Sequence, residues 1–491
     1  MTSAVRQIYR VPLLLGLLAG TTALFSLSTP LESKSTPAAP ARQVDLIFVQ
    51  APKLATGTFT GRFPDGSRIV RLKRASNPKA PEVLTADFLA AADPQVDFTG
   101  THILFSAKKD AATRWQIWEM AADGSGKRQL SHCEDDCLRG EYLPGEEIVY
   151  TEVKSAEGRE RSQLQVARLD GTNAHAITFG PGNWWLETVL RDGRVVASAA
   201  WPLQETKTPS AARTLYTLRP DGTGLDSLRC DNEGTGRRSD AAERADGSIL
   251  FIESAARQTA PGGQLTEVTR GAVKEREVGL KSVRTLSPRA MPDGTIVLAK
   301  ARTNASGRET FDLVEMKTTA TSGATFVYAG EALSSIQPVA LAPHERPKKF
   351  WSLVDLESKA GYLIALDAYS TQDAAGQRIA VPIAKVRVHT AAESAGGSRL
   401  LGEAPVEADG SFFVEVPANL PVRFELLDAQ GNVLLAERGW IWARPGEQRG
   451  CAGCHADKSL APQNRWPMTL KRFDTPTKLG ERPNGSTATA K

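Results

Sequence analysis

The sequence predicts an all-β protein in which a β-propeller is followed by a small β-sandwich. In one recurring motif, a loop that ends in glycine leads into a short β-branched strand, as at residues 65–70 and 294–298. In a second motif, a strand is followed by Asp-Gly and a short polar stretch, at residues 116–131, 164–178 and 215–228. Asp-Gly between short strands is a strong hairpin signal, because glycine accepts the positive φ of the turn.

The glycines of the first motif mostly lie ~45–54 residues apart, which is a spacing typical of propeller blades. One such unit cannot bury both of its faces, so the units are expected to pack around a ring. A single sandwich of this length would be unusually large, and a solenoid would repeat at a shorter period. Segments 44–88 and 336–371 show fewer strands. If they share one blade the ring has six blades, and if each forms its own blade it has seven.

The second half of the chain predicts a different β-structure. Short alternating strands at residues 379–441, with turns such as Asp409-Gly410, indicate a β-sandwich. Trp440 and Trp442 lie at its end, where they could wall a binding pocket or belong to ordinary domain core. Residues 473–491 are polar and rich in Pro, Gly, Thr and Lys, so we expect a disordered tail.

The N-terminus is predicted to be an export signal. Arg6 and Arg10 precede an apolar run at residues 11–27, and small residues follow at the spacing that a signal peptidase uses. The run is at the short end of the roughly 17–25 residues that span a bilayer, so an uncleaved anchor is the alternative. Residues 29–43 are rich in Pro, Ala and Ser, which predicts a flexible leader. We therefore expect a periplasmic or extracellular protein that could reach a membrane only through an uncleaved N-terminal segment.

A short motif near the end of the chain carries the chemistry. Residues 449–455 read Arg-Gly-Cys-Ala-Gly-Cys-His, and Cys-x-x-Cys-His is the attachment signature of c-type haem. Cys451 and Cys454 would form thioethers with the haem vinyl groups, and His455 would ligate the iron. Half of a zinc site and a redox Cys-x-x-Cys are the alternatives. However, no second Cys/His pair follows His455, and the sequence around it lacks a βαβ pattern. We therefore predict one covalent haem c.

Composition is compatible with this organisation. The 491 residues are 41% hydrophobic and 24% charged, as in ordinary soluble proteins, and suffice for two or three domains. The net charge of +4 is too small for this length to indicate a nucleic-acid partner. The predicted parts are a signal peptide or anchor (1–28), a leader (29–43), a WD-like propeller (44–371), a sandwich (379–441), a haem-binding segment (442–472) and a tail (473–491).

The sixth iron ligand has several candidates. Met468 is close to the motif in sequence, and a thioether would raise the reduction potential, but a packing role is the alternative. His132, His344 and His389 are the other candidates. An open sixth position would instead permit chemistry on a small nitrogen or oxygen species.

Three cysteines remain after the haem motif: Cys133, Cys137 and Cys230. Cys133 and Cys137 could pair as a local disulfide, or could bind a second metal such as zinc together with His132. The acidic run at residues 134–136 could hold calcium, although a solvated acidic turn would have the same composition. The spacing alone does not decide between these alternatives.

Several segments resemble one family. Residues 401–412, 416–418, 427–429, 444–447 and 450–455 together resemble the middle domain of the hydrazine synthase alpha-subunit family. The preceding half resembles that family's N-terminal region, which is itself similar to TolB-type WD-like propellers. The resemblance implies a six-bladed propeller and a c-type haem held by two motif cysteines.

The sequence also departs from that family. In the family's enzyme, a tyrosine four residues after the motif histidine ligates the iron and the histidine serves a zinc site. Ser459 stands at that position here, and because a serine hydroxyl is a poor iron ligand, we expect His455 to bind the iron. A zinc site shared between His455 and Cys133 remains an alternative. The alpha subunit also carries a second haem, and this sequence has a single Cys-x-x-Cys-His, so the resemblance does not by itself imply hydrazine synthesis.

Three functions compete on this evidence. The preferred one is an exported monohaem cytochrome that passes single electrons to a redox partner protein in a periplasmic complex. The second is a hydrazine synthase-like haem enzyme, an oxidoreductase with an open distal site. The third is a propeller scaffold with a structural haem. The first is preferred because one haem cannot store the electrons of a multi-electron reaction. Hydrolase and nucleotide-binding motifs are not visible in the sequence.

Overall fold

The computed structural model describes residues 44–480 with short gaps, and residues 43–491 form one compact unit. The gaps are residues 56–57, 75–79, 157–158, 202–211, 229–235, 270–275, 281, 304–306, 318–322, 371–378, 393–396, 438 and 454–464. The predicted signal, leader and final residues lie outside the described part. Within that part, no helix has the length and apolar character that a membrane crossing requires.

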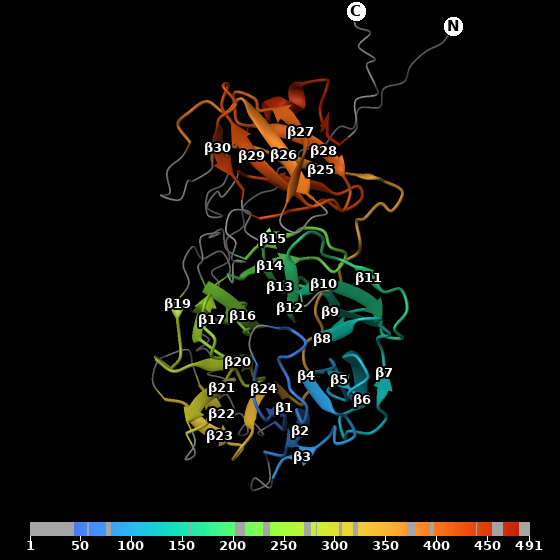
Figure 1. Ribbon diagram of the computed structural model, residues 1–491, viewed down its shortest axis with the longest axis vertical. Helices are drawn as coiled ribbons and strands as arrows, with labels where there is room; N and C mark the ends of the chain where they lie inside the picture. The colour runs from blue at the N-terminus through green and yellow to red at the C-terminus, as the bar shows by residue number, and fades with distance from the viewer. Residues whose placement is uncertain are drawn as a thin grey trace, which may run out of the picture. The chain divides into compact units, whose positions relative to one another are not determined.

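Six four-stranded antiparallel sheets in the described residues form the blades of a propeller (Figure 1). Blade I has the order β24 (Ser334–Ala340), β1 (Leu46–Ala51), β2 (Arg68–Leu72), β3 (Glu82–Val83). Blade II consists of β4 (Ala90–Val96), β5 (His102–Lys108), β6 (Gln116–Ala121) and β7 (Arg128–Gln129). Blade III consists of β8 (Asp136–Leu143), β9 (Glu147–Ala156), β10 (Arg159–Arg168) and β11 (His175–Ala176).

The other three blades repeat the same arrangement. Blade IV consists of β12 (Asn183–Val189), β13 (Val195–Ala200), β14 (Thr214–Leu218) and β15 (Asp226–Ser227). Blade V consists of β16 (Gly236–Glu243), β17 (Ile249–Ala255), β18 (Gln264–Val268) and β19 (Arg276–Glu277). Blade VI consists of β20 (Thr285–Ala290), β21 (Ile296–Thr303), β22 (Glu309–Met316) and β23 (Thr325–Tyr328). The predicted propeller is confirmed, with six blades in the described chain.

The ring is closed by strands from its two ends. β24 pairs with β1, with Ala340 opposite Leu46 and Ile336 opposite Val49. The first and last propeller segments therefore share blade I, which removes the open edge that each would otherwise present. The strands β4, β8, β12, β16, β20 and β24 contact one another in turn and form the inner ring.

Every inner strand carries a β-bulge near its middle, where the pairing register shifts. At five of these bulges a non-glycine residue has a φ between 50° and 54°. We call the residues at the six shifts the bulge residues: Asp93, Arg139, Glu187, Asp240, Ser287 and Gln337. Three of them are followed by proline, which is tolerated within a strand chiefly at a bulge.

A β-sandwich follows the propeller. One sheet has the order β27 (Ser398–Pro405), β26 (Lys385–Ala391), β29 (Val422–Leu427), β30 (Val433–Ala436). The other has the order β31 (Gln448–Cys451), β25 (Ala360–Ala365), β28 (Phe412–Pro417), β32 (Thr477–Lys478). Buried residues of both sheets, including Val388, Val414 and Phe424, form one core. A short 3-10 helix, η1 (Met468–Lys471), precedes β32.

The sandwich extends further along the chain than the sequence suggests. Residues 360–365 were assigned to the propeller on sequence grounds, but they form β25, which pairs with β28. Leu363 and Ala365 of this strand are each 2% exposed and belong to the sandwich core. Similarly, Thr477–Lys478 lie in the predicted tail and yet form β32 beside β28. The sequence of so short a strand does not predict which sheet it joins, because its pairing partners lie far away in the chain.

Candidate functional site

The Cys-x-x-Cys-His motif begins at the last residue of a sandwich strand. β31 runs parallel to β25, with Cys451 opposite Ala365, and the Leu366 amide donates to the Cys451 carbonyl at 2.9 Å. Cys451 is half-buried and is the free cysteine of the described residues. Cys454 and His455, like Cys230, lie outside the described residues. The structure therefore positions the first cysteine of the motif on a hydrogen-bonded strand.

A close backbone approach holds the turn after Cys451. A Cβ atom placed on Gly453 would lie 2.8 Å from the Ser370 carbonyl oxygen and 2.9 Å from that of Asp367. On the other side of residues 454–464, the Arg465 guanidinium lies 3.8 Å from the Asp367 carboxylate and donates to the Asp409 carbonyl at 2.7 Å. The chain on both sides of the motif's second half therefore contacts Asp367.

The strand that leads into the motif is also fixed by the turn between β14 and β15. Trp442 Nε1 donates to the Gly222 carbonyl at 3.0 Å. The Gly224 amide donates to Glu447 Oε1 at 2.8 Å. The Arg449 guanidinium donates to the carbonyls of Leu225 and Trp442. The edge strand β31, which carries Cys451, is thus held between the inner strand β25 of the sandwich and a turn of blade IV.

The Cys451 thiol has a low tendency to ionise. Burial raises its pKa, and the nearby Arg449 guanidinium opposes that shift only in part. The protonated thiol is therefore the form expected near neutral pH. A half-buried, protonated thiol of this kind reacts slowly, because the thiolate is the nucleophilic form.

The candidates for a sixth ligand are distributed over four parts of the structure. Met468 begins η1, is 39% exposed, and donates its amide to Asp409 Oδ2 at 2.8 Å. His344 is exposed, and its ring packs on Phe98 with centroids 5.5 Å apart. His389 Nε2 lies 3.0 Å from Glu425 Oε2 within the sandwich sheet. Met468 is held through its backbone amide, whereas the rings of His344 and His389 contact Phe98 and Glu425.

Cys133 and Cys137 are joined in a disulfide, with their Cα atoms 6.3 Å apart. The alternative in which they bind a metal with His132, or in which Cys133 shares zinc with His455, is therefore wrong for this structure, because bonded sulfurs cannot act as thiolates. His132 Nδ1 lies 3.2 Å from the Gln129 side-chain amide.

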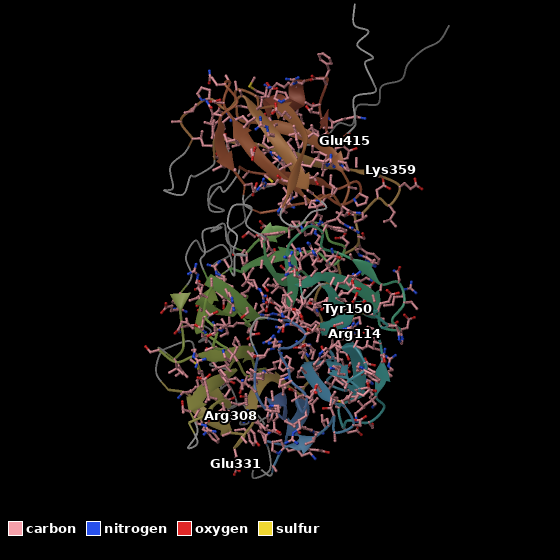
Figure 2. All side chains as sticks on the ribbon, in the orientation of Figure 1. Arg114, Tyr150, Arg308, Glu331, Lys359 and Glu415 are labelled. Carbon is pink, nitrogen blue, oxygen red and sulfur yellow. A yellow bond between two sulfur atoms is a disulfide. The ribbon has the colours of Figure 1, made fainter. Side chains whose placement is uncertain are left out.

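The acidic run between these cysteines has no metal-binding arrangement. Asp136 accepts a hydrogen bond from the Trp115 amide at 2.8 Å and lies 3.5 Å from Arg114, which is labelled in Figure 2. Burial raises the pKa of Asp136. In the described chain, no three His, Cys, Asp or Glu side chains gather as a metal site would require.

The two tryptophans before the motif belong to the core. Trp442 is fully buried, and its ring meets those of Trp184 and Phe179 edge-on, with centroids 5.4 and 5.5 Å away. Trp440 is 4% exposed and lies under the Arg423 guanidinium at 5.4 Å. Sequence reasoning did not find the clamp formed by Trp442, Glu447 and Arg449. The only sequence feature that could have indicated this clamp is the Arg-Pro-Gly-Glu run at residues 444–447, which lies between Trp442 and Arg449.

Comparisons with known proteins agree with this architecture. Residues 363–456 match the family model of the hydrazine synthase alpha subunit middle domain. Hydrazine synthase subunit alpha of Kuenenia stuttgartiensis is 34% identical over 118 residues, which are 23% of this chain and 14% of that protein. The solved structure of Kuenenia stuttgartiensis hydrazine synthase superposes with a TM-score of 0.72 at 20% identity, covering 87% of this chain and 71% of that one.

The structural match and the sequence matches support different conclusions. The structural match shows the fold, from the propeller into the sandwich. The sequence match to the curated relative spans 14% of its length, so the activity of the whole relative is not transferred by it. The matched segment contains part of β25, the sandwich strands β26 to β31 and the complete motif at residues 451–455. Within residues 363–456, this chain is therefore similar in sequence to the hydrazine synthase alpha subunit middle domain.

Proposed function

We propose that this chain is an alpha-like subunit of an exported redox assembly, in which one c-type haem acts on a small nitrogen or oxygen species. The observation that carries the proposal is the position of Cys451. It is a free cysteine on the strand that enters the Cys-x-x-Cys-His motif, within the segment that matches the hydrazine synthase family.

The residues present fit a covalent haem. Cys451 keeps an unbonded thiol in a structure that joins Cys133 to Cys137, so this thiol remains available for a thioether. The motif supplies two thiols for two vinyl groups and a neighbouring imidazole in His455 for the iron. When bound, the haem supplies one-electron redox chemistry at its iron. Arg449 and Gly453 position the attachment strand, and partner proteins would deliver any further electrons.

Single-electron transfer is the second candidate function. Met468 favours it, because its side chain is partly exposed on η1. It is also close in sequence to Arg465, and Arg465 and Gly453, on the two sides of the motif's second half, both contact Asp367. A thioether as sixth ligand would raise the reduction potential and close the iron to substrates. The two candidates therefore differ in whether the iron has an open position.

The test is expression of the full chain in a periplasm with the c-type maturation system. We expect the pyridine haemochrome spectrum of c-type haem, and we expect the haem to stay on the protein during acid-acetone extraction. The double variant Cys451→Ser/Cys454→Ser should lose the covalent haem, whereas the control Cys133→Ser/Cys137→Ser should keep it. A colourless wild-type preparation, or equal haem content in both double variants, would contradict the proposal.

Carbon monoxide separates the two candidates. Rapid binding to the reduced wild-type protein indicates an open position and supports catalysis on a small molecule. No binding in the wild type, together with rapid binding in Met468→Ala, indicates a thioether ligand and supports electron transfer.

A further inference from the structure

The inner ring of the propeller contains a buried group of polar side chains to which the haem proposal assigns no role. The six bulge residues point toward one another across neighbouring blades and are between 1% and 7% exposed. Gln337 Nε2 donates to Asp93 Oδ1 at 2.6 Å, which joins blade I to blade II. Ser106 links Asp93 to the Arg139 amide, through contacts of 3.1 and 2.8 Å. Charged groups so deeply buried require partners.

Arg139 lies between two carboxylates. One terminal nitrogen of its guanidinium is 3.5 Å from Glu187 Oε2, and the other is 3.5 Å from Asp240 Oδ1. The Ser287 amide donates to the other Asp240 oxygen at 3.2 Å. Arg139, Ser287 and Asp240 therefore meet at one place in the ring, although they come from three different blades.

Three polar atoms at this place have no hydrogen-bond partner in the structure. They are Arg139 Nε, Ser287 Oγ and Glu141 Oε2. Arg139 and Ser287 are 5% and 6% exposed, so bulk water does not reach them freely. Glu141 is two residues beyond Arg139 on β8, and burial raises the pKa of its carboxyl. Two of the three atoms are donors, and a protonated Glu141 would make the third a donor as well.

Two more guanidinium groups face the same region, and carboxylates lie near both without forming a direct ion pair. Arg213 packs over the Phe59 ring at 5.0 Å, and Arg289 donates to the Ala241 carbonyl at 3.5 Å. Within the described chain, neither is within ion-pair distance of an acidic side chain. Burial, opposed by Glu187 and Asp240 but reinforced by Arg237 and Arg62, lowers the pKa of Arg213 to about 10. Burial also lowers the pKa of Arg289, and Glu141, Asp240 and Glu187 oppose that shift in part.

The described residues of the loop between β1 and β2, 52–55 and 58–67, cover this region. Phe59 stacks on Trp185 of blade IV with centroids 4.6 Å apart, and Arg62 donates to Asp240 of blade V at 3.1 Å. The Phe59 amide donates to Glu160 of blade III at 2.6 Å. In a ring of six, blade IV lies opposite blade I, so the loop must cross the propeller axis to make these contacts. Figure 1 shows it in blue inside the inner ring.

We propose that the centre of the propeller, under this loop, binds a small oxyanion through Arg139, Arg213, Arg289 and Ser287. The available groups are N–H and O–H donors, and guanidinium groups match the geometry of oxyanions. Nitrate, sulfate and phosphate are small oxyanions with this geometry, and they are the ligands to test. This site is separate from the haem motif and does not depend on the function proposed for it.

The test uses the purified full chain in chloride buffer and titrates nitrate, sulfate and phosphate by calorimetry. At least one of them should bind saturably with one site per chain. Arg213→Gln and Arg289→Gln should each weaken that binding by about tenfold or more, as expected for a lost charge-assisted hydrogen bond. Arg399→Gln, which changes an exposed arginine on β27, is the matched control and should bind as the wild type does.

A milder variant keeps the test valid if the arginine variants fail to fold. Ser287→Ala removes one donor without changing charge and should weaken the same anion several-fold. Saturable binding should also persist in Cys451→Ser/Cys454→Ser, so the outcome is independent of haem attachment. The absence of saturable binding would mean that ordered water alone satisfies these groups, and an equal loss in Arg399→Gln would place the anion elsewhere. Either result overturns the proposal.

Discussion

Aspartate side chains explain why Asp-Gly recurs along the sequence. In each of six turns, Oδ1 of the aspartate accepts from the amide two residues later at 2.9–3.0 Å and from that residue's hydroxyl at 2.6–2.7 Å. The aspartates are Asp123, Asp170, Asp221, Asp246, Asp293 and Asp409. Glycine in between takes the positive φ that the turn requires. The motif is therefore a local hydrogen-bonding unit.

Asp409 has an additional role, because its second oxygen accepts from the Met468 amide and anchors η1. Burial tends to raise its pKa, but the hydrogen bonds from Ser411 and Met468 prevail, so the pKa is lowered. A carboxyl with a lowered pKa stabilises the fold above its unfolded pKa, which is about 3.9, and loses that contribution as pH falls further. Asp409→Asn should therefore cost about 1–2 kcal/mol at pH 7 and less near pH 3.

Urea denaturation of the wild type and of Asp409→Asn, at pH 7 and at pH 3, measures this difference. Asp123→Asn is the control, because it changes a turn of the same type to which no second element is anchored. Its loss in free energy of unfolding should be smaller. An equal loss at both pH values would show that the Asp409 charge is not responsible.

At the scale of secondary-structure elements, Trp442 anchors the segment that leads into the Cys-x-x-Cys-His motif. Its side chain is fully buried against Phe179 and residues of blades III and IV, including Trp184, and it donates to the Gly222 carbonyl. The following strand, β31, then pairs with β25. A short edge strand has few hydrogen bonds of its own, so its position depends on contacts at both ends.

Trp442→Ala should destabilise the protein by about 3–5 kcal/mol, because it leaves a large cavity and an unpaired Gly222 carbonyl. The midpoint of urea denaturation and the near-ultraviolet circular dichroism report this loss. Trp466→Ala is the matched control, because Trp466 is 67% exposed and its removal should leave the midpoint nearly unchanged. Similar losses in the two variants would refute the anchoring role.

Closure of the ring is a property of the whole molecule. β24 lies almost 300 residues after β1 in the chain, roughly the full length of the propeller, and completes blade I. Its Ile336 is fully buried in a core that includes residues of blades I, II and VI. The contact between chain ends makes the blades into one cooperative structure, because each inner strand then has two neighbours.

Ile336→Ala should cost about 2–5 kcal/mol and should expose the partner strand β1. Hydrogen exchange followed by mass spectrometry should show lost protection at Leu46–Ala51, with a smaller change at the sandwich strands. Val339→Ala, at a partly buried position of the same strand, should have the weaker effect. Uniform loss of protection along the chain would show that closure does not act through blade I.

The sequence by itself determined the parts of this protein that depend on neighbouring residues. Asp-Gly turns, glycine spacing and alternating strands were enough to predict the propeller and a sandwich after it, because hairpins bury their faces through contacts that lie close in the chain. The Cys-x-x-Cys-His motif is equally local. The prolines after Asp93, Ser287 and Gln337 were an available signal for the inner bulges that the sequence reading did not use.

Only the tertiary structure decided what depends on distant residues. It placed β25 in the sandwich, chose a disulfide for Cys133 and Cys137, and put Trp442 in the core. It also gathered arginines and carboxylates from several blades at the propeller centre, where each side chain taken alone resembles an ordinary surface charge. The physical reason is that pairing, burial and charge compensation are set by which segments meet in space, and that choice is made by the closed ring as a whole.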